Sequence, residues 1–306
     1  MQSLRSTACG PFVGLATLLA STAVAAAPTV TIVEGPNSVV SGAAAYLTTP
    51  GMRLQTCDIV RTGAQAIVQL EDEDGGQILI GPDSLFVVDL PPGGEGVVGP
   101  YFLISGWAKV TVPKRNKAPP YQINTPHVDL STPAGVVALR VGTDGSEFFV
   151  EQGDATASSS STARTAVTAG HLFARKAGAG RGAVSDNLKQ AFVAGMPRAF
   201  HDTLPARLAM VKANNPRPRP APDYNPAEVQ GWLRSAPELQ ACVVSDAVRA
   251  AQQMLSKNGF DVGPIDGILG RRTGAALRDF QQQQQLTQTG KLDADTLRAL
   301  DALGRR

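Results

Sequence analysis

The chain has 306 residues, a formal net charge of +2, 31 Gly, 22 Pro and only 5% aromatic residues. This length is sufficient for two domains, and the Gly and Pro content favours short strands and turns over long helices. Because no basic segment is interleaved with aromatic residues, we do not expect the chain to bind nucleic acid.

Residues 1–26 have the pattern of a secretory signal peptide. Arg5 precedes an apolar run over residues 11–19, and small residues come after it. The run is too short to span a bilayer as a stable helix, and the small residues predict cleavage after Ala25 or Ala26. We therefore expect a periplasmic protein with no transmembrane span in the mature chain. An uncleaved N-terminal anchor is the alternative.

Residues 28–176 are predicted to form an all-β domain. Short runs rich in β-branched and apolar residues alternate with Gly, Pro and Asp clusters at fairly regular spacing. This spacing is typical of a β-sandwich, a barrel or a β-solenoid, and the strand pattern does not decide among them. The expected strands cover residues 67–70, 78–80, 85–90, 101–112, 136–141, 147–151 and 166–173.

Part of this β domain resembles the FecR domain of bacterial envelope proteins. The match spans roughly residues 43–151, and Cys57 stands where the family usually has Gly. FecR-like domains occur in proteins that control extracytoplasmic sigma factors and that have a cytoplasmic segment and a membrane span. We expect neither segment here, so the resemblance implies a scaffold or partner-binding module. The matching positions, which we expect to be structural, are Leu54, Asp58, Ile59, Arg61, Thr62, Gly63, residues 66–70, Asp74, Gly75, Gly76, residues 78–80 and Ser84.

A helical extension and a Pro-rich linker are expected next. Residues 177–213 should contain two short helices, over 187–194 and 198–212, and residues 214–226 should form the linker. Polyproline II geometry would make the linker a semi-rigid spacer that holds the β domain away from the C-terminal helical region. Alternatively, it wraps along the β domain and the two parts pack together. Trp232, just beyond it, is expected to be a packing anchor in preference to a glycan-stacking platform.

Residues 227–306 are predicted to be helical, with a three-helix core over 246–303. Ser245 and Asp293 are suitable N-caps, and Gly259 is a suitable helix stop. The order of residues resembles the three-helix peptidoglycan-binding domain of cell-wall hydrolases and envelope proteins, which implies that the chain binds peptidoglycan. The matching positions are Gln252, Gln253, Leu255, Gly259, Phe260, Asp266, Gly267, Gly270, Thr273, Ala276, Phe280, Gln281, Thr289, Gly290, Leu292, Asp293, Thr296, Leu297 and Leu300.

The resemblance implies a ligand groove where the Asp-Gly turn meets the second helix. Arg271 and Arg272, at the start of that helix, would pair with stem-peptide carboxylates. Phe280 falls on the apolar stripe and is expected in the core, and several of the other positions are expected to build the fold as well. The predicted ligand-binding residues are Asp266, Gly267, Gly270, Arg271, Arg272, Thr273 and Gln281.

Charge is uneven along the chain. Between residues 30 and 155, fourteen acidic residues outnumber seven Lys and Arg, whereas ten basic residues between 156 and 222 face only Asp186 and Asp202. Such a basic segment would be attracted to an anionic wall polymer. The equally supported alternative is a solvated face or the electrostatic partner of the acidic domain.

No catalytic or metal-binding pattern stands out, so we expect no enzyme activity, cofactor or metal. His127, His171 and His201 form no pair at metal-ligand spacing, and neither Cys57 nor Cys242 has the neighbours of a catalytic nucleophile. Two other functions remain open. One is a cell-wall hydrolase with a catalytic β domain, and the other is a wall-tethered signalling or interaction protein with an unidentified envelope partner.

Two cysteines, Cys57 and Cys242, remain in the mature chain once Cys9 is removed with the signal. In the periplasm they could form one disulfide between the β domain and the helical region. Two buried, apolar thiols are the alternative.

Overall fold

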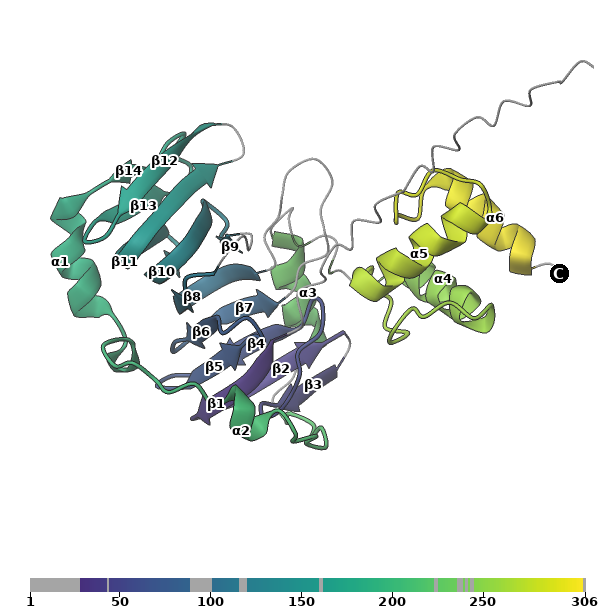
Figure 1. The fold of residues 1–306 in the computed structure, drawn as a ribbon, viewed down its shortest axis with the longest axis horizontal. Coiled ribbons are helices and arrows are strands. Elements are labelled where there is room, and N and C mark those ends of the chain that lie inside the picture. The colour runs from purple at the N-terminus through teal and green to yellow at the C-terminus, as the bar shows by residue number, and fades with distance from the viewer. Residues whose placement is uncertain are drawn as a thin grey trace, which may run out of the picture.

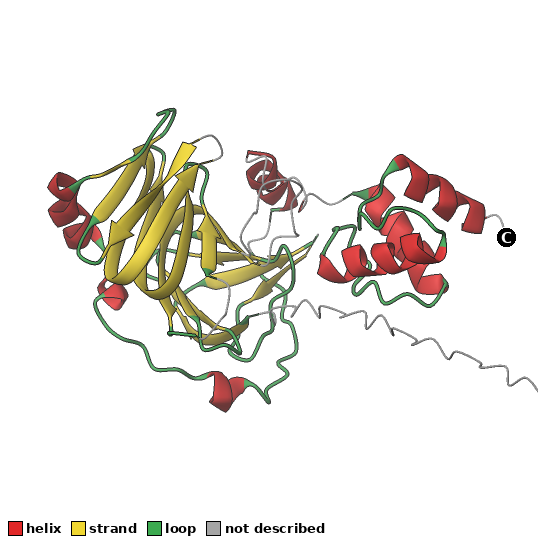
Figure 2. Cartoon of the chain, turned by 45° about the horizontal axis from the view of Figure 1, so that its top comes forward, coloured by secondary structure: helices red, strands yellow, loops and turns green. Residues whose placement is uncertain are grey.

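The computed structural model describes residues 28–42, 44–88, 101–115, 120–159, 162–222, 225–235, 239, 242 and 245–304. The expected signal peptide and its cleavage site lie outside these residues. A β domain comes first and a helical module last (Figures 1 and 2). Within the described residues, the helices are all too short or too polar to cross a membrane.

The β domain is a single open sheet with fourteen strands in the part of the chain that the structure describes. Its sheet does not close, which rules out the barrel among the three architectures that the strand pattern left open. The strands are β1 Thr29–Glu34, β2 Asn37–Ser41, β3 Ala44–Leu47, β4 Ile59–Thr62, β5 Ile67–Glu71, β6 Gln77–Ile80, β7 Leu85–Val88, β8 Tyr101–Val112, β9 Tyr121–Asn124, β10 Asp129–Gly142, β11 Gly145–Ser159, β12 Thr162–Thr168, β13 Leu172–Lys176 and β14 Ala183–Val184.

Three long strands, β8, β10 and β11, change partners halfway along. The first half of β8 pairs with β7 and the second half with β6. In the same way β10 passes from β9 to β8, and β11 passes from β13 to β12. Register shifts mark these changes in β10 and β11, as expected where bulges bend a strand. The sheet therefore folds over into two layers that face each other, and the architecture is sandwich-like.

Side chains that alternate between the two faces of each strand explain how both layers of the sheet bury apolar residues on their inner and outer faces. In β7, Phe86 and Val88 point into the core between the layers, whereas Val87 points to the outer face. In β6, Ile78 and Ile80 point inward while Leu79 points outward. Because successive side chains alternate between faces, uninterrupted apolar strands require a cover on each outer face.

Helical segments provide these two covers. Phe192 of α1 (Asp186–Gly195) and Phe200 of η1 (Arg198–Phe200) pack on Leu79 and the outer face of the layer that contains β5 and β6. Val229 and Leu233 of α3 (Pro226–Ser235) pack on the outer face of the other layer, which contains β2, β4 and β7. Both aromatic and aliphatic side chains thus bury apolar area that would otherwise face water.

The segment over residues 201–222 runs along the β domain as a strap. The buried carboxylate of Glu71 accepts hydrogen bonds from the backbone N–H groups of Arg207 (2.8 Å) and Leu208 (3.1 Å), at the start of the short helix α2 (Leu208–Val211). Lys212 forms an ion pair with Glu73 at 2.8 Å. This part of the basic segment is therefore an electrostatic partner of the acidic domain.

The second of the two expected short helices, over residues 198–212, is wrong as a single helix. Only η1 and α2 are helical there, and they are separated by an extended stretch that includes Pro205. Proline cannot donate a backbone hydrogen bond in a helix interior. The carbonyl of Pro205 instead accepts a hydrogen bond from Nε2 of Gln69, at 3.1 Å. Similarly, the strand expected over residues 166–173 is two strands, β12 and β13, joined by a turn at Gly170 (φ 86°).

The Pro-rich segment pairs with the edge of the β domain. The backbone N–H of Leu47 in β3 donates to the carbonyl of Arg219 (2.8 Å), and the N–H of Ala221 donates to the carbonyl of Ala45 (2.9 Å). These bonds cover part of an edge strand, which would otherwise expose unpaired backbone groups. Of the two expected arrangements, the structure therefore contains the wrapped linker and not the spacer.

The C-terminal module has three helices, α4 (Asp246–Lys257), α5 (Arg271–Gln283) and α6 (Ala294–Gly304). Ser245 caps α4 by accepting a hydrogen bond from the N–H of Val248. Aromatic and aliphatic side chains of all three helices form a small separate core. Its fully buried members are Ala251, Leu255, Val262, Ala276, Leu277, Phe280 and Leu300.

A disulfide links the β domain to the segment before this module. Cys57, in the turn just before β4, bonds to Cys242, with 5.4 Å between the Cα atoms. Both cysteines lie in a core cluster with Val229 and Leu233 of α3 and with Ile268 of the module. The covalent bond and this apolar cluster hold the module against the β domain.

The residues of the FecR-like pattern build turns. The carboxylate of Asp58 accepts a hydrogen bond from the N–H of Gln55 at 2.7 Å. The hydroxyl of Thr62 donates to the carbonyl of Gly81 (2.6 Å) and accepts from the N–H of Ser84 (2.9 Å). These buried polar side chains satisfy backbone groups at the ends of β4 and β7, which is a structural role.

Candidate functional site

The Asp-Gly turn of the helical module is organised by Gln252 of α4. The two N–H groups of its fully buried amide Nε2 are shared among three acceptors: Oδ1 of Asp266 (2.9 Å), the carbonyl of Ile268 (3.1 Å) and Oγ1 of Thr273 (3.1 Å). Its Oε1 accepts from the N–H of Gly267 at 2.8 Å. One side chain thereby joins α4, the turn and the first turn of α5. We call this set of bonds the Gln252 clamp.

The geometry of the turn requires its glycine. Gly267 has φ of 79°, in the left-handed region that side-chain-bearing residues rarely adopt. Asp266 closes the turn by accepting a hydrogen bond from the N–H of Ile268 at 2.9 Å. The carbonyl of Asp266 accepts another from Nη2 of Arg249 at 3.1 Å. Asp266 and Gly267 therefore position the start of α5 whether or not they also contact a ligand.

The N-terminal end of α5 carries two arginines next to an exposed apolar side chain. Arg271 and Arg272 are the first two residues of the helix, and Ile265 in the preceding turn is 46% exposed. Arg272 forms an ion pair with Asp261, and this hydrogen bond holds the pKa of that carboxyl below its usual range. Residues 245–304 contain seven basic and seven acidic residues, so any attraction for an anion must be local to this end.

Three of the predicted ligand-binding residues are buried: Gly267 in the turn, and the polar residues Thr273 and Gln281. Thr273 is 2% exposed, and its hydroxyl donates to the carbonyl of Val262 at 3.1 Å. Gln281 is fully buried, and its amide bonds Thr289 and Thr296 in the second turn of the module. Their polar atoms serve the fold, so we assign both residues to the structure of the module.

The other predicted residues gather at one place, which also borders the β domain. Asp266, Gly270, Arg271 and Arg272 surround the start of α5 and are at least partly accessible. A Cβ atom built on Gly270 would lie 3.4 Å from Cβ of Thr56. Thr56 of the β domain therefore lies directly beside the start of α5.

This contact between the β domain and the module was not predicted from the sequence, because it joins segments far apart in the chain. Gln252 was named in the sequence pattern, but its role as organiser of the turn was missed. Its position on the buried side of an expected helix was the available signal, since a buried amide must find several hydrogen-bond partners.

Comparison with known proteins supports the assignment of this module. Residues 244–300 match the family model described as "Putative peptidoglycan binding domain". The match includes all three helices except the end of α6. The family is a binding module and not a catalytic one. Within the described part of the chain, no group of three or more His, Cys, Asp or Glu could hold a metal ion.

Other similarities are more limited. The chain is 47% identical over 49 residues to the "Putative OxPP cycle protein OpcA" of Nostoc punctiforme, which is 16% of this chain and 10% of that protein. Two crystal structures described as a "putative anti-sigma factor" from Parabacteroides distasonis cover 45% of this chain and 64% and 65% of theirs, at 13% and 12% identity and a TM-score of 0.36. The chain thus spans about a tenth of the curated relative and under two thirds of these structures.

Proposed function

We propose that this chain is a non-catalytic, exported envelope protein that binds peptidoglycan through its C-terminal module and presents a FecR-like β domain. The match of residues 244–300 to a peptidoglycan-binding family carries this proposal. It is supported by a module whose turn at Gly267 is held by the Gln252 clamp. Residues 1–26 supply the export signal in this proposal, and the Cys57–Cys242 disulfide fits an oxidising compartment such as the periplasm.

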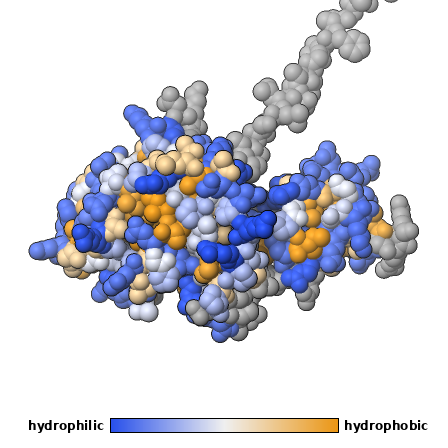
Figure 3. Space-filling view, turned by 90° about the horizontal axis from the view of Figure 1, so that it is seen from below, coloured by the Kyte–Doolittle hydropathy of each residue, from blue (hydrophilic) through white to orange (hydrophobic). Residues whose placement is uncertain are grey.

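The proposed contact surface is the N-terminal end of α5. There the helix dipole and the guanidinium groups of Arg271 and Arg272 provide positive charge, and the turn that precedes the helix exposes the side chain of Ile265. Carboxylates of the wall stem peptide would accept charge-assisted hydrogen bonds from these arginines. Figure 3 shows a face of the molecule on which a small hydrophobic patch lies on the helical module, within an otherwise hydrophilic surface. A charged and partly apolar surface suits a ligand that has both features.

Sedimentation with purified sacculi tests the proposal. Full-length mature protein should co-sediment, and a chain without residues 246–306 should stay in solution. The double variant Arg271→Gln/Arg272→Gln should lose about tenfold or more in affinity, because two charge-assisted donors are removed. The matched control is Arg278→Gln/Arg298→Gln, which makes the same change of charge at exposed positions elsewhere in the module. Equal retention of the truncated chain would reject the proposal.

The absence of catalysis is tested separately. Zymography on sacculi, with and without added zinc, should give no lytic band. A clear band would instead make the β domain the catalytic part of a wall hydrolase. In-cell crosslinking with the β domain as bait addresses the remaining alternative, a protein that docks an envelope partner while the module only tethers it.

A further inference from the structure

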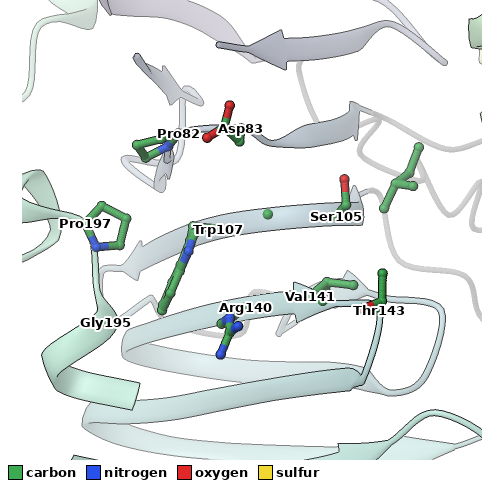
Figure 4. Close-up of a pocket in the computed structure, with 12 residues that line it drawn as sticks. Pro82, Asp83, Ser105, Trp107, Arg140, Val141, Thr143, Gly195 and Pro197 are labelled. Atoms are coloured by element: carbon green, nitrogen blue, oxygen red, sulfur yellow. The ribbon is translucent and has the colours of Figure 1, made fainter. Parts of the chain in front are cut away.

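The β domain has an open cleft of about 600 Å³ that is separate from the wall-binding module. One side is the turn at Pro82 and Asp83, and the opposite side is the end of β10 from Arg140 to Thr143 (Figure 4). Trp107 of β8 lies between them, and Pro197, just after α1, borders the cleft. None of these residues belongs to the module.

The backbone beneath the cleft adopts unusual conformations. Asp83 (φ 50°) and Gly106 (φ 91°) both lie in the left-handed region. Gly106 is the point at which β8 leaves β7 and joins β6, and a Cβ there would lie 2.3 Å from Oγ of Ser84. Oγ of Ser84 accepts a hydrogen bond from the N–H of Trp107 at 2.8 Å. Strained residues and bulges cluster at binding sites, where they aim a particular side chain.

Trp107 is held in place from the outer face of the sheet. Its ring centroid lies 5.2 Å from that of Phe192 and 6.2 Å from that of Phe200, in tilted and edge-on arrangements. The guanidinium of Arg140 lies 5.7 Å from the centroid of the Trp107 ring, within the range of a cation–π contact. The cleft thus contains a fixed aromatic ring with a cation beside it.

Most N–H donors of the Arg140 guanidinium are available to a ligand. Its one hydrogen bond within the described residues joins Nη1 to Oε2 of Glu147 at 3.5 Å, which is long for a charge-assisted bond. A guanidinium has five N–H donors, so most of those of Arg140 can serve a ligand. Asp83 provides an exposed carboxylate on the other side of Trp107. The cleft therefore offers one positive group, one negative group and an apolar surface between them.

We propose that this cleft binds a short zwitterionic peptide, one with a free amine and a free carboxylate, as in peptidoglycan stem peptides. The carboxylate would accept hydrogen bonds from Arg140, the amine would pair with Asp83, and aliphatic carbons would pack on Trp107. An uncharged sugar would leave both ionic groups unused, and a purely anionic ligand would be repelled by Asp83. A zwitterion is complementary to both charged sides of the cleft.

The choice of a wall peptide as the source rests on the proposed function of the C-terminal module. A chain held on peptidoglycan experiences a high local concentration of stem peptides, so a weak second site is occupied through effective concentration. The chemistry of the cleft itself does not depend on the module. Failure of one proposal can therefore be separated from failure of the other.

The indole N–H resonances of Trp107 and Trp232 in the full mature chain provide the test. The chain has two Trp residues, and a Trp232→Phe variant assigns the pair. On titration with the tripeptide L-alanyl-γ-D-glutamyl-meso-diaminopimelate, the resonance of Trp107 should shift and saturate. Arg140→Gln and Asp83→Asn should each weaken binding about tenfold or more, the effect of removing one charged partner. Asn tolerates the left-handed conformation at position 83, so that variant keeps the turn.

The control uses the second arginine–tryptophan pair of the chain. Arg61 lies 5.8 Å from the centroid of the Trp232 ring, nearly the geometry of Arg140 and Trp107. Arg61→Gln should leave the affinity reported by Trp107 unchanged. The proposal is overturned if Trp107 does not respond at millimolar peptide, if Arg140→Gln and Asp83→Asn bind as the parent chain does, or if N-acetylglucosamine shifts Trp107 as strongly as the peptide. Sacculus retention that persists in these variants supports the wall module independently.

Discussion

Gln281 repeats in the second turn of the helical module what Gln252 does in the first. Nε2 of Gln281 donates to Oγ1 of Thr296 (2.8 Å) and to the carbonyl of Lys291 (3.1 Å), and its Oε1 accepts from the N–H of Gly290 (2.8 Å). Nε2 of Gln281 also bonds Oγ1 of Thr289 at 2.9 Å, a position that Asp266 fills in the first turn. The module therefore consists of two similar helix–turn–helix steps that share α5.

Loss of either glutamine should destabilise the module strongly. Gln252→Leu would leave the buried N–H of Gly267 without its acceptor, and Gln281→Leu would do the same to the N–H of Gly290. With the loss of the other bonds of each amide, either change should cost about 3 kcal/mol. Urea unfolding of the module should show the loss, and hydrogen exchange should quicken at Gly267 in the first variant and at Gly290 in the second. The neighbouring exposed residues provide matched controls, because Gln253→Leu and Gln282→Leu should change stability by less than about 0.5 kcal/mol. Equal effects in all four variants would contradict the clamp model.

The Cys57–Cys242 disulfide should contribute several kcal/mol to stability. It closes a loop with a sequence separation of 185 residues, for which chain entropy gives about 5 kcal/mol as an upper figure. The variant Cys57→Ser/Cys242→Ser should therefore unfold at lower denaturant, and reductant should bring the parent chain to the same midpoint while leaving the variant unchanged. Thiol counting on the mature chain, purified without reductant, should find no free thiol. Two free thiols per chain would remove the bond and this prediction with it.

The helical module was predictable because its information is local. Gly267 must adopt a left-handed conformation and Ser245 must cap α4, and each requirement acts over a few residues. The sequence alone could not show that Thr273 and Gln281 are buried within the module and do not line a ligand groove. A polar residue that matches a family motif can equally well bind the ligand or bind the turn, and only its burial distinguishes the two.

The folded-over sheet was not predictable in the same way. Alternation in β6 and β7 identifies two buried faces, but which layer each face meets depends on pairings between distant strands. Gly106 within the predicted strand over residues 101–112 was the available signal, since glycine inside a strand often marks a bulge. The Pro-rich segment was misleading for a related reason. Its composition favours an extended backbone, and an extended backbone serves equally as a spacer or as an addition to the edge of β3.

The strap over residues 201–222 should depend on Glu71. In Glu71→Gln, an amide donor would replace one of the two oxygens that accept from the N–H groups of Arg207 and Leu208, and the buried N–H left unpaired should cost about 1–3 kcal/mol. Limited proteolysis should then cleave faster between residues 201 and 214. Glu73→Gln is the matched control: its ion pair with Lys212 is exposed, so its removal should have little effect. Equal protection of the strap in both variants would show that Glu71 does not hold it.

Stability should fall as the pH is lowered through the range in which His127 titrates. Burial, reinforced by the positive charge of Arg175, holds the pKa of His127 below its ordinary value of 6.5, while Asp144 opposes this shift. The unfolded chain therefore binds a proton at a higher pH than the folded chain, and acid favours unfolding. The loss should stay below about 1 kcal/mol because the side chain is partly exposed to solvent. Free energies of unfolding at about pH 7.5 and about pH 5.5 should differ less in His127→Gln than in the parent chain, whereas the exposed control His201→Gln should keep the full difference. An unchanged difference in His127→Gln would assign the pH dependence to other groups.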